Sequence, residues 1–308
     1  MSTSDSFNLQ AWLSAARLRT LPLAIASIGL GAFLAASNGV FNLLITILAI
    51  LTTVALQVLS NFANDYGDSI HGADSAERQG PARAVQSGII SPRTMQLGMM
   101  LMIFVAAVSG LLLVGTAFYQ AEGAGRWRLV ILFLVLGALA IWGAINYTAG
   151  KRPYGYAGMG DLAVLIFFGW LGVMGTYFLQ AQTIYPALFL PATSCGLFAV
   201  AVLNVNNIRD IDSDRKAGKF SIPVRIGRQK AIGYHWLLLV LGLLMGVLYV
   251  IFSYRSPWQF LFLLTTPLLV RNGLAVANTP SSELDPYLKQ MAIATLLFVV
   301  TFGIGQLI

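Results

Sequence analysis

The sequence predicts an all-α polytopic membrane protein, and three observations carry this prediction. Of the 308 residues, 57% are hydrophobic and only 10% are charged, whereas soluble domains carry roughly 25% charged residues. The hydrophobic residues gather in runs of about 20, the length that a helix needs to cross roughly 30 Å of hydrocarbon. The basic residues fall mostly on alternate loops between these runs. Because backbone polar groups in lipid must be satisfied internally, each run is expected to be a helix.

Nine hydrophobic segments follow one another along the chain, and we expect them to form a single membrane-embedded domain over residues 1–308. Within residues 1–20, an amphipathic stretch is typical of a helix that lies at the membrane interface. The single cysteine, Cys195, lies inside the sixth segment and is expected to be a small packing residue. The predicted membrane helices are 21–37, 43–63, 94–119, 129–149, 160–180, 184–206, 231–252, 258–277 and 288–307.

The loops between these segments differ in charge. With a cytoplasmic N-terminus, all but three of the 19 Lys and Arg residues lie on the cytoplasmic side; the exceptions are Arg126, Arg128 and Arg255. Basic residues favour that side, and one helix more or fewer would scramble the distribution. The count of nine therefore gains support, and the net charge of +7 needs no nucleic-acid partner to explain it.

The acidic residues are concentrated in two loops on the predicted cytoplasmic side, at about 64–92 and 207–230. Each cluster begins at the end of a hydrophobic helix, where the macrodipole is negative and carboxylates are unfavourable unless a cation compensates. Whether Asp65, Glu77 and Asp212 would touch such a cation is left open by the pattern. The two loops hold seven of the twelve acidic residues: Asp65, Asp68, Asp74, Glu77, Asp210, Asp212 and Asp214.

Both clusters share the spacing N-x-x-x-D. Asn64 lies four residues before Asp68, and Asn206, Asp210 and Asp214 follow one another at the same interval. A spacing of four places side chains on one face of a helix. Mg²⁺ takes few protein carboxylates and leaves coordination positions for phosphate oxygens. We therefore predict a magnesium site rather than two sets of ordinary solvated loop charges.

Basic residues accompany both acidic clusters. Arg78 and Arg83 follow the first, and Arg215 and Lys219 follow the second. Positive-inside bias alone is the alternative explanation, but it does not account for cations within a few residues of each cluster. Arginine matches the geometry of phosphate oxygens, so carboxylates and cations together predict a metal–diphosphate complex.

The loop after the fourth segment, YTAGKRPYGYAGMGD, holds three further candidates. Tyr147 and Lys151 are four residues apart, and Asp161 begins the fifth segment. An ionisable residue near membrane depth is a functional candidate, although an acid at this position is equally consistent with a helix cap. There are only two histidines, His71 and His235, and no nucleotide-binding or nucleophile-elbow motif, which gives no support to ATPase, dinucleotide or serine-hydrolase functions.

Several stretches resemble the UbiA superfamily of intramembrane aromatic prenyltransferases, from about Arg17 to the C-terminus. They are RLRTLPLA, QVLSNFANDYGDSIHGAD, GPARAVQSG, KRPYGYAGMGDLAVLIFFGWLGVMGTYFLQ and LNVNNIRDIDSDRKAGK. Within the superfamily the chain is similar to the MenA branch, which uses 1,4-dihydroxy-2-naphthoate. The commoner pattern has an acid where this chain has Gly72, and Asp74 follows at a spacing similar to that of the MenA branch.

This resemblance implies nine helices around a central cavity, with Mg²⁺ and a polyprenyl diphosphate at its cytoplasmic mouth. It implies that Asn64, Asp68, Asp74, Asp210 and Asp214 bind the metal and diphosphate. It further implies transfer of the polyprenyl group to 1,4-dihydroxy-2-naphthoate with loss of CO₂, giving demethylmenaquinol for menaquinone biosynthesis. Lys151, Asp161 or Tyr147 would then orient or deprotonate the acceptor hydroxyl. In a bacterium the protein would lie in the plasma (inner) membrane.

Two alternatives remain at this stage. One is a related prenyltransferase that uses another acceptor, such as 4-hydroxybenzoate, homogentisate or haem. The other is a secondary transporter, because intramembrane charges and internal repeats are transporter traits. The carboxylates favour the enzyme, since they lie at one membrane face rather than near the midplane.

Overall fold

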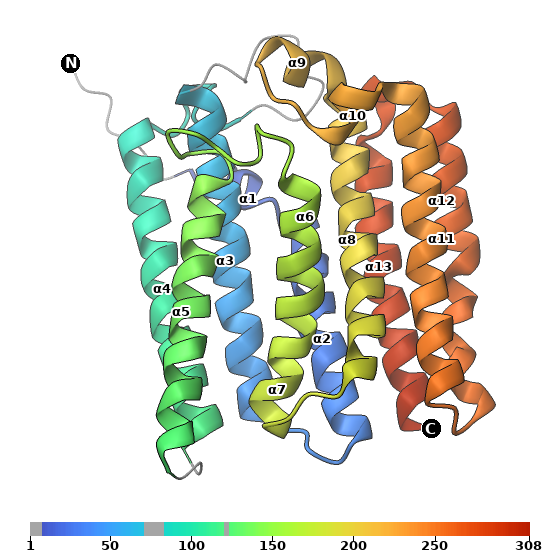
Figure 1. Ribbon diagram of the computed structural model, residues 1–308. Helices are drawn as coiled ribbons and strands as arrows, with labels where there is room; N and C mark the ends of the chain where they lie inside the picture. Colours follow the sequence, from blue (N-terminus) through green and yellow to red (C-terminus); the bar gives the residue numbers. More distant parts are fainter. Residues whose placement is uncertain (1–7, 71–82, 120–122) are drawn as a thin grey trace.

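The computed structural model describes residues 8–70, 83–119 and 123–308, which form a bundle of upright helices joined by short loops (Figure 1). Within these residues, nine helical spans are long and apolar enough to cross a membrane, as predicted. They consist of α2 (Leu21–Ser37), α3 (Leu43–Ile70), α4 (Pro92–Phe118), α5 (Ala124–Asn146), α6–η2–α7 (Gly160–Val164, Leu165–Met174, Gly175–Ala181), α8 (Phe189–Arg209), α11 (Arg228–Phe252), η4–α12 (Pro257–Thr265, Thr266–Asn278) and α13 (Asp285–Leu307).

Short helices complete the described chain. The first, α1, buries Ala11, Ala15 and Ala16, packs against α3 and leaves Leu9 and Leu13 exposed. The others are η1 (Leu18–Thr20), η3 (Pro186–Leu188), α9 (Ile211–Lys216), α10 (Ile222–Ile226) and η5 (Ser281–Glu283); α1 spans Leu9–Ala16.

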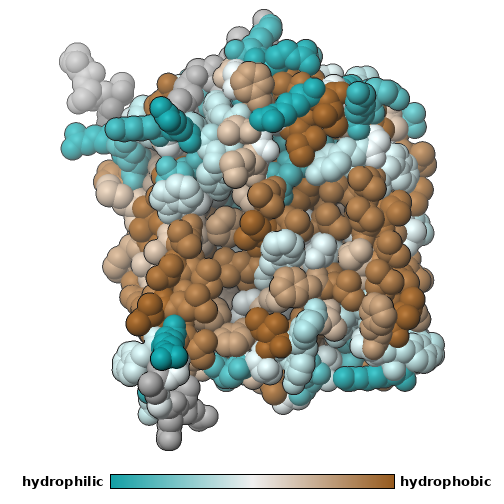
Figure 2. Space-filling model, in the orientation of Figure 1, coloured by the Kyte–Doolittle hydropathy of each residue, from teal (hydrophilic) through white to brown (hydrophobic). Residues whose placement is uncertain are grey.

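Hydrophobic side chains cover the middle of the bundle in Figure 2, and hydrophilic ones gather toward its two ends. Large apolar side chains such as Phe104, Val135 and Leu264 are exposed there, which would be unfavourable in water and is expected in lipid. The bundle surface and the nine apolar spans together define an integral, multi-pass membrane protein.

Helix α8 lies at the centre of the larger packing core and contacts α11, η2 and α13. Small residues let the neighbouring backbones approach. A side chain on Gly169 of η2 would come 2.7 Å from the carbonyl oxygen of Ala192, and one on Gly172 would come 1.9 Å from Ser27 Oγ of α2. The middle of the fifth span is a π-helix rather than an α-helix, and π-helical turns often accompany functional sites.

The first acidic segment begins on a helix rather than in a loop. Hydrophobicity predicts an end at residue 63, but α3 continues to Ile70 and carries Asn64, Asp65 and Asp68. The extra turns are stable because neighbouring segments supply polar partners for these side chains. In the second segment, α8 ends at Arg209, Asp210 caps it, and α9 follows directly, with the Asp214 N–H donating to the Asp210 carbonyl over 2.8 Å.

Candidate active site

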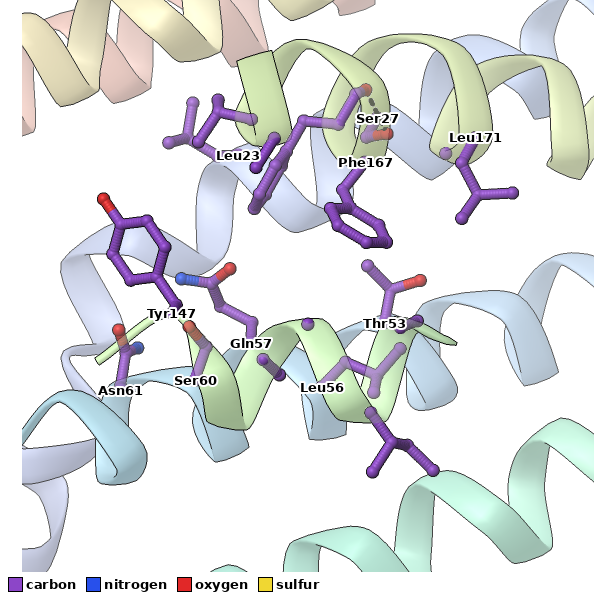
Figure 3. Close-up of a pocket in the computed structure, with 18 of the residues that line it drawn as sticks. Leu23, Ser27, Thr53, Leu56, Gln57, Ser60, Asn61, Tyr147, Phe167 and Leu171 are labelled. Atoms are coloured by element: carbon purple, nitrogen blue, oxygen red, sulfur yellow. Dashed lines mark hydrogen bonds between the residues drawn. The ribbon is translucent and has the colours of Figure 1, made fainter. Parts of the chain in front are cut away.

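A cavity of about 560 Å³ runs from the end of the bundle that carries the acidic residues down between the helices. Figure 3 shows Leu23 and Ser27 of α2 and Phe167 and Leu171 of η2 facing α3 across this space. Its deeper walls are mainly apolar, whereas its mouth is polar. The mouth is lined by Arg17, Gln57, Asn61, Asn64, Asp68, Arg83, Tyr147, Thr148, Asn206, Asp210, Asp214 and Lys219.

The α3 side of the mouth is fixed by contacts with two other segments. Thr148 donates to Asn64 Oδ1 over 2.7 Å. Asp68 is buried and accepts from Arg83 over 2.6 Å and from the Tyr156 hydroxyl over 2.9 Å. These bonds hold the predicted N-x-x-x-D pair against the loop after α5 and the segment before α4.

The α8–α9 side of the mouth carries the second cluster. Arg209 donates to both oxygens of Asp210 and to Asn206 Oδ1. Lys219 Nζ lies 3.2 Å from Asp214 Oδ1. Asn206, Asp210 and Asp214 all line the cavity, so the two acidic clusters, which are far apart in the sequence, meet at one mouth as predicted.

Two loops close over this mouth and bind each other. The Phe220 N–H donates to the Tyr156 carbonyl over 2.8 Å. Arg225 donates to the carbonyls of Phe220 and Ala157. The left-handed Gly158 is required here, because a side chain would come 2.5 Å from the Phe220 carbonyl oxygen. The loop after α5 thereby links the two acidic clusters.

The field at the mouth is set by buried charges of both signs. Burial alone would lower the pKa of Lys219, but the carboxylates of Asp214 and Asp68 outweigh it and raise that pKa above its usual value. Burial raises the pKa of Asp214, and the Lys219 ammonium partly opposes this. Burial also raises the pKa of Tyr147 to about 12. Tyr147 therefore enters neutral solution as a hydroxyl, a donor rather than a base.

The donor set at the mouth fits a hard divalent cation. Three carboxylates and two amide oxygens line it, and such oxygens are the ligands that Mg²⁺ prefers. Asp214 Oδ2 is buried and has no hydrogen-bond partner among the described residues, an arrangement that a cation would satisfy. No three described His, Cys, Asp or Glu side chains converge closely enough to hold an ion by themselves. Asp74, Glu77 and Arg78 lie outside the described residues.

Other predicted site residues are not brought to the cavity. Lys151 and Arg215 are exposed, and neither lines it. Asp161 is buried behind the wall and accepts from Tyr234 over 2.9 Å. Asp212 is exposed, and Asp65 uses both oxygens to accept from the backbone N–H groups of Ala84 and Val85. Asp65 thus anchors the segment before α4.

The sequence interpretation missed Gln57 and Asn61, and it did not single out Arg17 within a group of four cations. Gln57 and Asn61 donate to Thr20 Oγ1, and Asn61 also donates to the Ala16 carbonyl. A signal for them was available, because residues 57, 61, 64 and 68 form one stripe at helical spacing. Arg17 faces the cavity because it ends α1 in the left-handed conformation, at φ 49°, which spacing does not reveal.

A helical membrane bundle with an acidic, cation-lined mouth above an apolar cavity is the arrangement of an enzyme that handles a charged head group on a lipid-like chain. The model of the UbiA prenyltransferase family matches residues 24–287. The chain belongs to this family and is a prenyltransferase.

Curated relatives match over nearly the whole chain. A protein of Escherichia coli (strain K12) named 1,4-dihydroxy-2-naphthoate octaprenyltransferase is 46% identical, covering 99% of this chain and 99% of the relative. A protein of the same name from Haemophilus influenzae is 45% identical, covering 97% and 96%. The family and this degree of identity favour the enzyme over the transporter alternative.

Solved structures share the fold at low identity. A UbiA homolog from Aeropyrum pernix K1 has a TM-score of 0.69 at 18% identity, covering 94% of this chain and 97% of the other. A UbiA homolog from Archaeoglobus fulgidus, solved bound to GPP and Mg²⁺, has a TM-score of 0.61 at 15% identity, covering 96% and 99%. These likenesses confirm the predicted UbiA-like architecture.

Proposed function

We propose that this enzyme transfers a polyprenyl group from polyprenyl diphosphate to 1,4-dihydroxy-2-naphthoate with loss of CO₂, giving demethylmenaquinol. The observation that carries the proposal is the joining of an acidic, cation-lined mouth to an apolar cavity within lipid. The names of the relatives at 46% and 45% identity support the acceptor. The product belongs to menaquinone biosynthesis.

Asp68, Asp210 and Asp214, with Asn64 and Asn206, would hold Mg²⁺ together with the diphosphate oxygens. The unsatisfied Asp214 Oδ2 supports this assignment, as does the Mg²⁺ in the Archaeoglobus fulgidus homolog. A protein set too sparse to enclose an ion is expected where phosphate oxygens complete the coordination. The bound metal would neutralise negative charge on the departing diphosphate. Asp74 is proposed for the same set from the sequence.

Lys219 and Arg83 are the cations best placed to bind the diphosphate, because both line the mouth beside the carboxylates. Each would neutralise charge that develops on the leaving group, and a preorganised cation does so without reorganisation. Arg78 remains a proposal from sequence. Arg215, exposed and outside the cavity lining, has only its position in the sequence in its favour.

The reaction balances without a redox partner. The allylic C–O bond breaks, and the diphosphate leaves with the bonding electron pair. The ring carbon that carries the carboxylate forms the new C–C bond, and the pair from its bond to the carboxylate returns to the ring as CO₂ departs. The apolar cavity shields the allylic cation from water, and Tyr147, at the boundary between the mouth and the apolar part, can donate a hydrogen bond there.

The acceptor carboxylate requires a cation in the cavity. Four cations qualify by sequence, and Arg17 alone of these lines the cavity. Arg19 forms an ion pair with Asp285, while Lys151 and Arg152 are exposed outside the cavity. We therefore assign the acceptor carboxylate to Arg17, beside Gln57 and Asn61. Lys151 and Asp161 could act on the acceptor hydroxyl only after rearrangement of the wall.

The test uses purified protein in lipid nanodiscs, with carboxyl-labelled 1,4-dihydroxy-2-naphthoate, a polyprenyl diphosphate and Mg²⁺. Labelled CO₂ and the prenylated lipid should appear together in equal amounts. Parallel reactions receive 4-hydroxybenzoate or homogentisate. Product from one of these alone, or a naphthoate product that keeps its label, would show that the acceptor is wrong while leaving the prenyltransferase intact.

The mouth is proposed to face the cytoplasm, which the distribution of basic residues supports. Because Cys195 is buried, new surface cysteines can be labelled against a low background. Asp212→Cys at the acidic end and Val40→Cys at the opposite end should differ in intact cells. An impermeant maleimide is expected to label only the Val40→Cys variant. Labelling of Asp212→Cys instead would reverse the assignment.

A further inference from the structure

One side wall of the cavity is incomplete. Helix α5 packs against α3 and α4, but it makes no extensive backbone contact with η2 or α7 among the described residues. The cavity is nevertheless lined from both sides of this gap, by Leu134 and Gly137 of α5 and by Leu171 and Gly175 of η2 and α7. These two walls stand next to each other at the front of the bundle in Figure 1.

Aromatic side chains close the gap above and below. Toward the acidic end, the Phe167 ring meets α5 at Gly143, where a side chain would come 3.0 Å from the ring. Toward the opposite end, Phe133 of α5 stacks on Phe178 of α7 with ring centroids 5.6 Å apart and an interplanar angle of 14°. The opening between these two contacts is called the window below.

The window is tall enough for a hydrocarbon chain and reaches the outer surface. Ten residues of α5 separate Phe133 from Gly143, which is about 15 Å of helix at 1.5 Å per residue. Between them, Leu134 lines the cavity and is also 39% exposed. A side chain at Gly137 would have no heavy atom within 4 Å. The cavity is therefore continuous with the lipid-facing surface at this height.

The far wall of the window is held in place from behind. Ser27 of α2 donates to the Phe168 carbonyl over 2.6 Å, and Gly169 and Gly172 pack directly on α8 and α2. The π-helix is thus fixed on its rear side, while Phe167 and Leu171 point into the cavity (Figure 3). An opening with one fixed wall is a built passage rather than a loose seam.

The geometry points to this window as the path by which the polyprenyl tail leaves the cavity and extends into the bilayer, an inference that rests on the proposed prenyl transfer. A cavity of about 560 Å³ must already take a diphosphate, a bicyclic acceptor and the first isoprene units. A chain of eight units, the length in the relatives' names, needs space beyond it. The tail has no polar groups, so contact with lipid costs it little.

The inference makes chain length the diagnostic variable. Gly137→Phe places a large ring in the window, and Val135→Phe places the same ring on the exposed outer face of α5, where Val135 does not line the cavity. Both variants are compared with wild type for kcat/KM with octaprenyl diphosphate and with geranyl diphosphate. The two isoprene units of the geranyl donor stay inside the cavity.

Gly137→Phe should lower kcat/KM for the octaprenyl donor on the order of tenfold or more, through overpacking against the tail, with a much smaller loss for the geranyl donor. Val135→Phe should match wild type with both. Leu134→Trp provides a second obstruction if Gly137→Phe folds poorly. Equal losses with both donors, or no loss with either, would overturn the window. If the wild type uses neither donor, the proposed function fails instead.

A photoreactive group at the end of the polyprenyl tail gives an independent measurement. Cross-links should map to α5 and α7 and should compete with unlabelled octaprenyl diphosphate. Cross-links on other helices, such as α2 or α13, would place the tail elsewhere. Cross-links at the window that a lipid displaces but the prenyl donor does not would assign the window to a membrane lipid and reject the inference.

Discussion

Lys219 Nζ lies 3.2 Å from Asp214 Oδ1, while the other oxygen of Asp214 is buried without a partner among the described residues. A carboxylate held on one side by a cation and open on the other is prepared for a second cation. Asp214→Asn should therefore raise the Mg²⁺ concentration needed for half-maximal turnover by roughly 10–100-fold, as lost metal-site groups do.

Titration of product formation with Mg²⁺ measures this effect. Asp212→Asn is the matched control, because Asp212 is two residues away, exposed and outside the cavity lining. It should keep the wild-type curve. The metal assignment is wrong if both variants shift equally, or if the wild type retains full activity in excess chelator.

Asp65 is expected to matter for stability rather than for metal binding. Its two oxygens accept from the N–H groups of Ala84 and Val85, at 3.1 and 3.0 Å. Asp65→Ala leaves both buried donors unsatisfied, at a cost of about 1–3 kcal/mol each. The unfolding temperature in detergent should fall clearly, whereas the Mg²⁺ dependence of the remaining folded enzyme should not change. A shifted Mg²⁺ dependence at normal stability would make Asp65 a ligand.

Tyr147 should act as a hydrogen-bond donor at every physiological pH. Its pKa is raised by burial from 10.0 to about 12, so the hydroxyl keeps its proton well above neutrality. Tyr147→Phe should lower kcat but leave the shape of the pH–rate profile below pH 9 unchanged. If the variant loses an ionisation between pH 6 and 9, Tyr147 is the base after all.

The same shift has a consequence for stability. In the unfolded chain tyrosine ionises near pH 10, but in the folded protein Tyr147 does so only near pH 12. Because the folded state binds more protons in this interval, its contribution to stability is intact below pH 10 and is lost as pH rises toward 12. Thermal unfolding between pH 8 and 11 should show a smaller alkaline loss for Tyr147→Phe than for wild type.

Arg17 is expected to select the acceptor. Arg17→Gln should raise KM for 1,4-dihydroxy-2-naphthoate on the order of tenfold or more, the scale of one lost charged hydrogen bond, and leave KM for the prenyl diphosphate near wild type. Lys151→Gln, an exposed cation outside the cavity lining, is the control. Equal increases in both KM values would place Arg17 at the diphosphate instead.

The acidic segments show how far local pattern reaches. Four-residue spacing correctly placed Asn64 with Asp68 and Asn206 with Asp210 on shared helix faces, because that spacing is a property of the helix itself. It did not show that α3 continues to Ile70. The continuation depends on Thr148, Tyr156 and Arg83, whose hydrogen bonds come from other segments.

The sequence by itself determined the nine apolar spans, the two acidic clusters and the family, because hydropathy, helical spacing and motif identity are all written along the chain. Only the tertiary structure decided which cations reach the cavity: Arg17 lines it, while Arg19 is paired with Asp285. It alone placed the window, through the contact of Gly143 with Phe167. Such features depend on how helices distant in sequence pack, and packing between distant segments leaves no periodic signal in either one.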